Sequence, residues 1–588
     1  MSNEARLQKE KRFEGICASP GIAHAEAIVH QRAAEEIVRW TIRAEEIPNE
    51  INRFETALIA TRAELLEMQQ QIAQSIGTAD ASIFDAHLLV VEDRTLIDEV
   101  LRCISDGENV EYAFHKTADR YCKSLEAIDD AYLRERVVDI EDVAQRVIRN
   151  LLGKSEDTSA PALDRKHIRI ARDLTPSDTA AVDREFVMGF ATEMGSLTSH
   201  TAIMARSLSI PAVVGLPNVC SQVSAGDSIL LDGYRGVLIV NPSPETLAEY
   251  QEFQAQRDEV DAQLEQIRDT VSTTSDGAHI VLSANIELPD EMEDVIDNGA
   301  EGVGLFRSEF LFLHGGAMPD EEKQFQAYRE VAERCQPHSV IIRTLDIGGD
   351  KDFSSLGFPT EANPFLGCRA IRFCLQNLDI FKTQLRAILR ASNHGDVKVM
   401  YPMVSGLSEF REANAILAEC QEELRSEGIP FDEDIQIGIT IEIPSAALTA
   451  DLIAKEADFF SIGTNDLIQY TIAVDRVNER IAHLYKPTHP SILRLIRMTV
   501  DAARANNIWV GVCGEMAGDI RLTPILLGLG IEELSASPSL VPRVKRAVQS
   551  LDLAACQAMV GKALGSTSAA EILELTTALA RERYGDLL

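Results

Sequence analysis

The chain has 588 residues, of which 45% are hydrophobic and 25% charged, a composition typical of globular proteins that argues against a disordered chain. Because single hydrophobic cores stop growing near about 250–300 residues, this length predicts two or three domains. The formal net charge of -37 argues against a nucleic-acid partner, since binding to phosphates needs clustered lysine and arginine. No apolar run is long enough to span a bilayer, so membrane insertion is not expected.

The cysteines and the first residues of the chain indicate the cellular compartment in which the protein works. The 10 cysteines show no paired spacing of the kind that binds a metal, and residues 1–4 lack the apolar core of a secretory signal. Both features are typical of a reducing environment, so we expect a cytoplasmic location in which the thiols mostly fill cores.

The first half of the chain predicts an α/β domain with a helical insertion. Over residues 44–154 apolar side chains such as Phe54, Leu58 and Leu65 recur at helical spacing, with almost no glycine or proline between them. Before and after this block the pattern changes to short β-type runs, including a hairpin around Asp232. We therefore expect one discontinuous domain, residues 1–43 and 155–242, that carries a helical bundle.

The second half predicts a barrel. Residues 243–270 are charged, rich in glutamine and helix-forming, which indicates a helical linker. Residues 271–588 contain eight apolar runs separated mostly by helical stretches. These runs are 280–286, 302–306, 340–345, 397–401, 435–441, 459–463, 509–512 and 533–536. Eight such units predict a (β/α)8 TIM barrel, so the fold class is multidomain α/β.

Polar side chains fall where such a barrel has its active site. They lie at or just past the predicted strand ends: Arg307, Arg343, Glu442, Asn465, Asp466 and Cys513. Four arginines, Arg307, Arg343, Arg369 and Arg476, would then gather near one mouth and could clamp a small anion that has several charges. Any one of them alone is more often a surface ion-pair partner.

Two carboxylates predict a metal site. Glu442 and Asp466 end neighbouring strands, so their oxygens can face one point and bind Mg²⁺, with water and phosphate oxygens completing the shell. In the alternative, Glu442 pairs with an arginine and Asp466 caps a helix that begins at Leu467. Cys513 could protonate a developing enolate, although a cysteine after a β-run is more often inert packing.

His200 is the candidate nucleophile. It ends a loop at the start of an apolar helical run, and a helix N-terminus lowers the pKa of an imidazole and keeps it neutral. The hydroxyls of Thr179, Thr198 and Ser199 could bind an incoming phosphoryl group. A hydrogen-bonded structural histidine is the alternative.

At this point the chain resembles a known family. Residues 198–207 and 458–467 resemble the two signatures of phosphoenolpyruvate-utilising enzymes, and residues 302–310, 343–351 and 363–367 match further family segments. The resemblance to the enzyme I family of the bacterial phosphotransferase system covers all but about the first dozen residues.

The resemblance implies a role for each candidate residue. It makes His200 the phosphorylated nucleophile, Glu442 and Asp466 the Mg²⁺ ligands, and Cys513 the acid that protonates the enolate to pyruvate. Phosphoenolpyruvate would bind to a set of polar residues in the barrel: Arg307, Arg343, Asn465 and Arg476. The helical block, with residues 82–87 on its surface, would dock an HPr-like phosphocarrier protein, and the barrel would form a homodimer.

One departure and two alternatives remain. The family usually has a second glycine before the Thr-Ser-His segment, where this chain has Ser196 and Leu197. This makes the loop before His200 less permissive, and we expect altered tuning of that loop rather than loss of activity. A dikinase-type enzyme would need a nucleotide-grasping domain, for which the N-terminal block is too short and shows no glycine-rich phosphate loop. A catalytically silent sensor is disfavoured by the intact set of reactive residues. Neither the acceptor nor a role in sugar uptake or regulation follows from the sequence.

Overall fold

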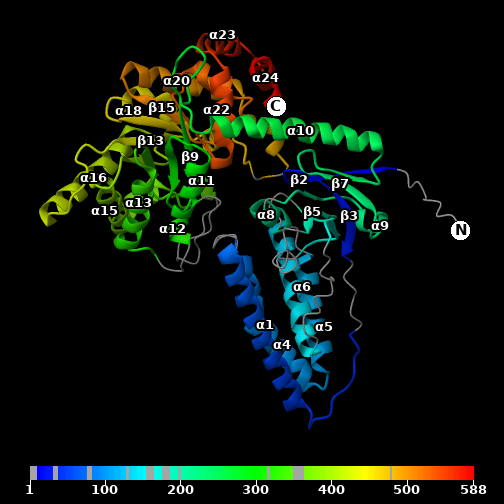
Figure 1. Cartoon of the computed structure of the whole chain (residues 1–588). Coiled ribbons are helices and arrows are strands. Elements are labelled where there is room, and N and C mark those ends of the chain that lie inside the picture. Colours follow the sequence, from blue (N-terminus) through cyan, green and yellow to red (C-terminus); the bar gives the residue numbers. More distant parts are fainter. Residues whose placement is uncertain are drawn as a thin grey trace. The chain divides into compact units, whose positions relative to one another are not determined.

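The computed structural model describes residues 10–30, 37–75, 83–126, 131–153, 165–174, 186–195, 200–208, 210–313, 318–348, 363–476, 478 and 480–588. The chain divides into two compact units, Met1–Ala255 and Gln256–Leu588 (Figure 1). The first combines a sheet with a helical bundle, and the second is a barrel. The predicted multidomain α/β fold is therefore confirmed, whereas the exact domain boundaries remain predictions.

The sheet of the first unit has eight strands in the order β1-β8-β7-β3-β4-β5-β6-β2. Their bounds are β1 Lys11–Glu14, β2 Ile16–Ser19, β3 Ile22–His30, β4 His167–Ala171, β5 Val187–Thr192, β6 Ala212–Val214, β7 Ser228–Asp232 and β8 Val237–Val240. β3 pairs in parallel with β4, although the whole bundle separates them in sequence. The bundle is therefore an insertion between two adjacent strands of one sheet.

The bundle packs around a continuous apolar core. Its helices are α1 Ile47–Ser75, α3 Ile83–Val91, α4 Arg94–Ser105, α5 Val110–Glu126 and α6 Ala131–Leu151. Phe54 and Phe114 meet in that core with ring centroids 5.7 Å apart. Phe84 and His87 are fully buried, and the other side chains of residues 82–87 lie outside the described part, so the docking role of this segment remains a prediction.

Two short helices and one long helix complete the first unit. Helices α8 His200–Ser207 and α9 Val219–Gln222 lie between its strands in sequence, and α10 Pro244–Ile267 leads into the second unit. In the first unit Tyr250 of α10 packs against β7 and β8, and in the second unit Leu264 of α10 joins the barrel core.

Eight parallel strands close the barrel in chain order, β9 to β16. They are β9 Val281–Ile286, β10 Gly302–Arg307, β11 Ser339–Arg343, β12 Val397–Tyr401, β13 Ile437–Ile441, β14 Phe459–Ile462, β15 Trp509–Val512 and β16 Glu533–Ala536. Each lies within two residues of a predicted run, because long buried β-type runs separated by helices leave little choice of register. The predicted TIM barrel is confirmed.

Helices surround the barrel. They are α11 Met292–Asp297, α12 Phe310–Leu313, α13 Glu321–Cys335, α14 Ile371–Gln376, α15 Leu378–Ser392, α16 Leu407–Glu427, α17 Pro444–Leu448, α18 Ala450–Ile453, α19 Thr464–Ile472, α20 Pro490–Ala505, α21 Thr523–Leu529, α22 Val541–Ser550, α23 Leu553–Ala563 and α24 Ala569–Tyr584. Inside the barrel, Trp509 stacks on Phe459 with ring centroids 4.7 Å apart. The interior is thus a packed core that supports the mouth.

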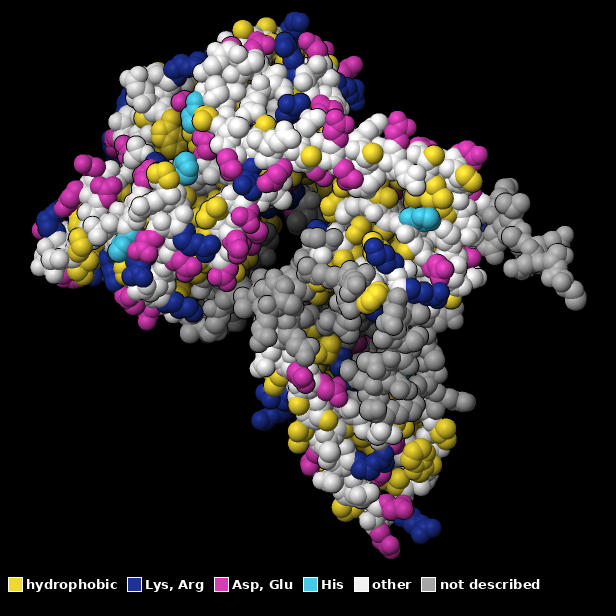
Figure 2. Space-filling model, in the orientation of Figure 1, with side chains coloured by type: hydrophobic (Ala, Val, Ile, Leu, Met, Phe, Trp, Pro, Cys, Tyr) yellow, Lys and Arg dark blue, Asp and Glu magenta, His cyan; other side chains and the backbone are white. Residues whose placement is uncertain are grey.

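The outer face of the barrel unit carries charge of both signs. Figure 2 shows acidic and basic side chains interspersed over this unit, consistent with ion pairs such as Arg390 with Glu321. Across the described part of the chain, no helix combines the length and the apolar composition that crossing a membrane requires.

Candidate active site

The candidate residues of the barrel lie at one end of it. Arg307 and Arg343 are the last residues of β10 and β11, and Glu442 and Cys513 directly follow β13 and β15. Asn465 and Asp466 lie in the first turn of α19, just after β14. Since all eight strands are parallel, these ends open onto the same mouth.

Buried ion pairs join the arginines to carboxylates. Asp346 lies 3.1 Å from Arg343 Nη1 and 3.0 Å from Arg369 Nη2, so one carboxylate holds two guanidinium groups. Arg343 Nη2 is 2.5 Å from Glu309, and Arg369 Nη2 is 3.5 Å from Asp466. We call these five residues the mouth network. Its arginines are only 8% and 4% exposed, so the pairs are well shielded from water.

The arginines retain hydrogen-bonding capacity. Nε of Arg343, Nε of Arg369 and Nη1 of Arg476 are buried and have no hydrogen-bond partner among the described residues. Buried donors are nearly always satisfied in folded proteins, because an unmade bond costs about 1–3 kcal/mol. Three such donors around one mouth are what a bound oxyanion would satisfy.

Arg307 and Arg476 lie at the rim, each with about a third of its side chain exposed. Arg307 Nη1 is 2.7 Å from Glu287, and Arg476 Nη1 is 3.6 Å from Glu515. Asn465 exchanges two hydrogen bonds with Glu515, at 3.1 and 3.0 Å. These partners are solvent-accessible carboxylates, so the rim pairs can be exchanged for a ligand at little cost.

The two predicted metal ligands are close enough to interact electrostatically. Glu442 is 2% exposed, and burial together with the charges of Asp466 and Asp346 raises its pKa to about 8. Burial also raises the pKa of Asp466. Gly463 leaves room for this arrangement, since a Cβ there would lie 2.8 Å from Glu442 Oε2.

These carboxylates suit a divalent cation. Two buried carboxylates that repel each other and offer hard oxygen atoms fit Mg²⁺, which would relieve the repulsion. Among the described residues no group of three His, Cys, Asp or Glu side chains forms a ready metal cluster. Mg²⁺ usually completes its shell with water or substrate oxygens.

The alternatives for these carboxylates are wrong. α19 begins at Thr464, so Asp466 lies inside the first turn and is not the N-cap, which is Gly463. No described arginine forms an ion pair with Glu442. Its Oε1 instead accepts a hydrogen bond of 2.5 Å from the backbone N–H of Met403, whose φ of 56° is rare for a residue with a side chain.

Cys513 holds its proton. The thiol is 5% exposed, and burial raises its pKa to about 11, opposed by a hydrogen bond with Ser461 and by the positive charges of Arg343 and Arg307. The thiol is therefore neutral near pH 7 and can act as an acid.

His200 is the first residue of α8, and its side chain lies outside the part that the structure describes, as do Thr179, Thr198 and Ser199. Their roles remain predictions. In the barrel, by contrast, sequence reasoning missed Asp346, Glu309 and Tyr470, whose hydroxyl accepts a bond of 3.1 Å from Arg369. Asp346 follows Arg343 by three residues, and that spacing beyond a strand end was an available signal.

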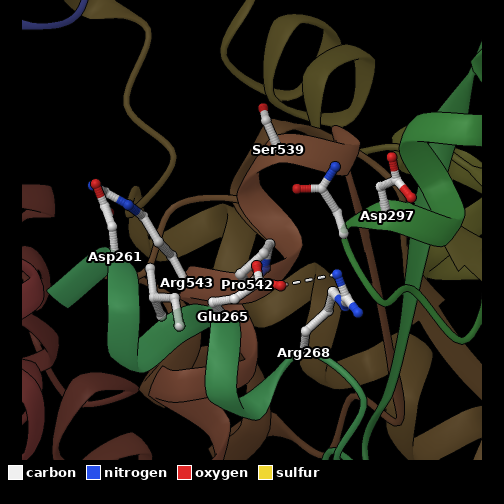
Figure 3. A pocket seen from close by; sticks show the side chains of 9 residues that line it. Asp261, Glu265, Arg268, Asp297, Ser539, Pro542 and Arg543 are labelled. Atoms are coloured by element: carbon white, nitrogen blue, oxygen red, sulfur yellow. Dashed lines mark hydrogen bonds and ion pairs between the residues drawn. The ribbon is translucent and has the colours of Figure 1, made fainter. Parts of the chain in front are cut away.

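A cavity elsewhere in the barrel unit is not part of this site. It measures about 310 Å³ and contains none of the predicted residues; its lining includes Glu265, Arg268, Asp297, Ser539 and Arg543 (Figure 3). Arg268 is already paired with Glu265 at 2.9 Å, the contact drawn in the figure, and with Asp269 at 3.1 Å. The mouth network therefore remains the stronger candidate for binding an anion.

Known families match most of the chain. Residues 14–136 match the model "PEP-utilising enzyme, N-terminal", residues 163–236 "PEP-utilising enzyme, mobile domain" and residues 261–553 "PEP-utilising enzyme, PEP-binding domain". All the candidate residues of the barrel fall in the last of these ranges.

Curated relatives agree. A phosphoenolpyruvate-protein phosphotransferase of Listeria innocua is 44% identical over 96% of this chain and 98% of its own length. One from Bacillus sp. is 47% identical over 90% of this chain and 91% of its own length. A solved structure entitled "NMR solution structure of Enzyme I (nEIt) protein" is 42% identical and covers 42% of this chain and 99% of its own, with a TM-score of 0.35.

The barrel, its mouth and the three family matches define a phosphoenolpyruvate-utilising enzyme. The identity to curated relatives over nearly the full length is more specific. The chain belongs to the phosphoenolpyruvate-protein phosphotransferase family.

Proposed function

We propose that the chain transfers the phosphoryl group of phosphoenolpyruvate to His200 and then to a histidine of a small HPr-like phosphocarrier protein, releasing pyruvate. The observation that carries this proposal is the mouth network, in which Arg343 and Arg369 are fixed by one carboxylate and keep N–H donors that no described residue satisfies. Such donors suit a substrate that has both a phosphate and a carboxylate.

The substrate would bind to the mouth. Arg343 and Arg369 would hold oxyanions at the buried side, and Arg307, Arg476 and Asn465 would exchange their exposed carboxylate partners for substrate oxygens. Glu442 and Asp466 would hold Mg²⁺, which when bound neutralises charge on the phosphoryl group. Together with a bound cation, the arginine donors at this desolvated mouth would stabilise the charge that develops in the transition state.

In the transfer, the imidazole of His200 attacks phosphorus, an N–P bond forms and the bond from phosphorus to the enol oxygen breaks. The enolate then takes the thiol proton of Cys513 at its methylene carbon and becomes pyruvate. The thiolate regains a proton from water. Thr179 would help to bind the phosphoryl group near His200.

The cellular setting is also part of the proposal. The helical bundle would dock the phosphocarrier, the barrel would form a homodimer, and the enzyme would work in the cytoplasm as the first step of a relay. That relay would serve sugar uptake or its regulation.

The test is incubation of the full chain with ³²P-labelled phosphoenolpyruvate and Mg²⁺, in parallel with His200→Ala. We expect acid-labile label on the intact chain, none on the variant, and pyruvate release that rises when an HPr-like acceptor is added. Equal labelling of both proteins would refute the assignment of His200, and no pyruvate from the intact chain would refute the function.

A further inference from the structure

The backbone of Cys513 lies where the pairing between neighbouring barrel strands is short. β14 and β15 share four paired residues, whereas β15 and β16 share only two, Gly511 with Glu533 and Val512 with Leu534. The N–H of Cys513 donates to Ile462 O on the β14 side at 3.2 Å. On the β16 side the ladder ends at Val512, one residue before Cys513, so the carbonyl of Cys513 needs another partner.

A side chain of β9, the strand beyond β16, supplies the partner for this carbonyl. Asn285, near the end of β9, donates from Nδ2 to the carbonyl of Cys513 at 3.1 Å. Since β16 lies between β15 and β9 in the barrel, this amide reaches across a whole strand. Cys513 is thereby held on both sides, by Ile462 and by Asn285.

A second hydrogen bond fixes the orientation of the asparagine. Ser535 of β16 is 1% exposed and donates from Oγ to Asn285 Oδ1 at 2.6 Å. This bond decides which way the amide points, because it leaves the NH₂ group facing Cys513. Gly304 of β10 provides the space, since a Cβ there would lie 2.5 Å from Ser535 Oγ.

The segment after Cys513 is equally constrained. A Cβ on Gly514 would lie 2.0 Å from Thr464 Oγ1, so this glycine allows the chain to pack directly on the start of α19. The same turn of α19 carries Asn465 and Asp466. A shift at Cys513 would therefore move the thiol relative to the proposed substrate and metal ligands.

We propose that Asn285 and Ser535 are positioning residues that hold the thiol of Cys513 against one face of the enolate. The inference rests on the proposed function, in which Cys513 is the acid. In that step the S–H bond breaks, a C–H bond forms at the methylene carbon, and the electron pair of the enolate becomes the carbonyl of pyruvate. A thiol held in one place adds its proton to one face only, and a misplaced thiol leaves protonation to water from both faces.

The experiment uses phosphoenolpyruvate stereospecifically deuterated at C3, in tritiated water, and measures the chirality of the methyl group of pyruvate. The variants of the full chain are Asn285→Leu, Ser535→Ala and Cys513→Ala. Asn506→Leu is the matched control, because Asn506 also donates to a carbonyl, that of Ala502 at 2.8 Å, but lies at the end of α20.

We expect one methyl configuration from the wild type and from Asn506→Leu. Asn285→Leu should give a nearly racemic methyl group, with about a tenfold lower kcat and a KM that changes less than about twofold. Ser535→Ala should give a partial loss of methyl chirality. If Asn285→Leu does not fold, this variant tests the positioning role instead. A merely structural role would slow the reaction without changing the methyl configuration.

The outcomes separate the inference from the function. Chirality retained in both Asn285→Leu and Ser535→Ala but lost in Cys513→Ala would overturn the positioning role while leaving Cys513 as the acid. A racemic product from the wild type, or chirality retained in Cys513→Ala, would remove Cys513 as the acid and the inference with it.

Discussion

Two arginine–carboxylate networks in the barrel unit show how burial changes what similar ion pairs do. The first is the mouth network. The second, the helix network, joins Arg386 and Arg390 of α15 to acidic residues of α13 and α16, namely Glu321, Glu322, Glu423 and Glu427. Several of its contacts measure 2.7 Å, within the range of 2.5–3.5 Å found in the mouth.

The difference lies in exposure and in the donors that remain. The acidic side chains of the helix network are 26–59% exposed, and Arg386 bonds through Nε, Nη1 and Nη2. Arg343 and Arg369 are nearly inaccessible, and the Nε of each has no hydrogen-bond partner among the described residues. The exposed network therefore adds only stability, whereas the mouth network keeps buried donors that a ligand could bind.

The largest expected effect is in the mouth, from Asp346→Asn. Removing this charge leaves two buried arginines without their shared partner, and breaking buried pairs costs about 3–5 kcal/mol. We expect that loss in the free energy of unfolding and a strongly raised KM for phosphoenolpyruvate. Urea unfolding can be followed by fluorescence of Trp509 in a Trp40→Phe background, since the chain has two tryptophans. Glu423→Gln is the matched control in the helix network, and equal losses in the two variants would contradict the comparison.

A smaller effect should follow from Gly463→Ala, which disturbs the mouth without removing a charge. The new Cβ would lie 2.7 Å from Thr440 Cγ2 and 2.8 Å from Glu442 Oε2. Overpacking of this kind costs about 1–3 kcal/mol, and displacement of Glu442 should weaken Mg²⁺ binding, measurable by calorimetry on the full chain. Gly561→Ala is the control, because α23 has open space there and the change should stabilise by up to about 1 kcal/mol. Unchanged Mg²⁺ affinity in Gly463→Ala would mean that Glu442 is not a ligand of the metal.

Glu533 extends the comparison to a buried carboxyl that pairs with no arginine among the described residues. It accepts a hydrogen bond of 2.5 Å from Ser283, and burial raises its pKa above the ordinary value of about 4.3. Between those two pKa values the folded chain binds more protons than the unfolded chain, so the free energy of unfolding falls as the pH rises. Glu533→Gln cannot ionise and should gain stability relative to the wild type with rising pH, seen in urea unfolding at a series of pH values above about 4.5. A difference that does not depend on pH would mean that Glu533 does not titrate in this range.

The sequence predicted the barrel far better than the contacts within its mouth. Eight buried β-type runs place the strands, and parallel pairing alone brings Arg307, Arg343, Glu442 and Cys513 to one end. Which charge meets which depends on side-chain directions beyond the strand ends. The spacing of Asp346 from Arg343 was a signal for that pair, but the contact of Asp346 with Arg369 could not be predicted.

The same limit explains why the capping alternative for Asp466 failed. A cap is a local feature that a sequence suggests, but α19 begins at Thr464, three residues before Leu467. In the segment 82–87, which the resemblance assigns to the docking surface, helical spacing turns Phe84 and His87 into the bundle, and the other side chains there lie outside the described part. Contacts such as Asn285 with Cys513, 228 residues apart, leave no sequence signal.

The smallest expected effect is in the helix network, from Arg386→Ala. Its partners are exposed, so the Coulomb energy is screened by water and the loss in unfolding free energy should stay near about 1 kcal/mol. Salt should separate the two networks, because exposed pairs weaken with ionic strength and buried pairs do so much less. In urea unfolding with up to about 1 M NaCl, the cost of Arg386→Ala should therefore shrink while that of Asp346→Asn persists. If both costs fell together, water would reach the mouth as freely as the helix surface, and the unpartnered Nε atoms of Arg343 and Arg369 would be solvated rather than reserved for a substrate.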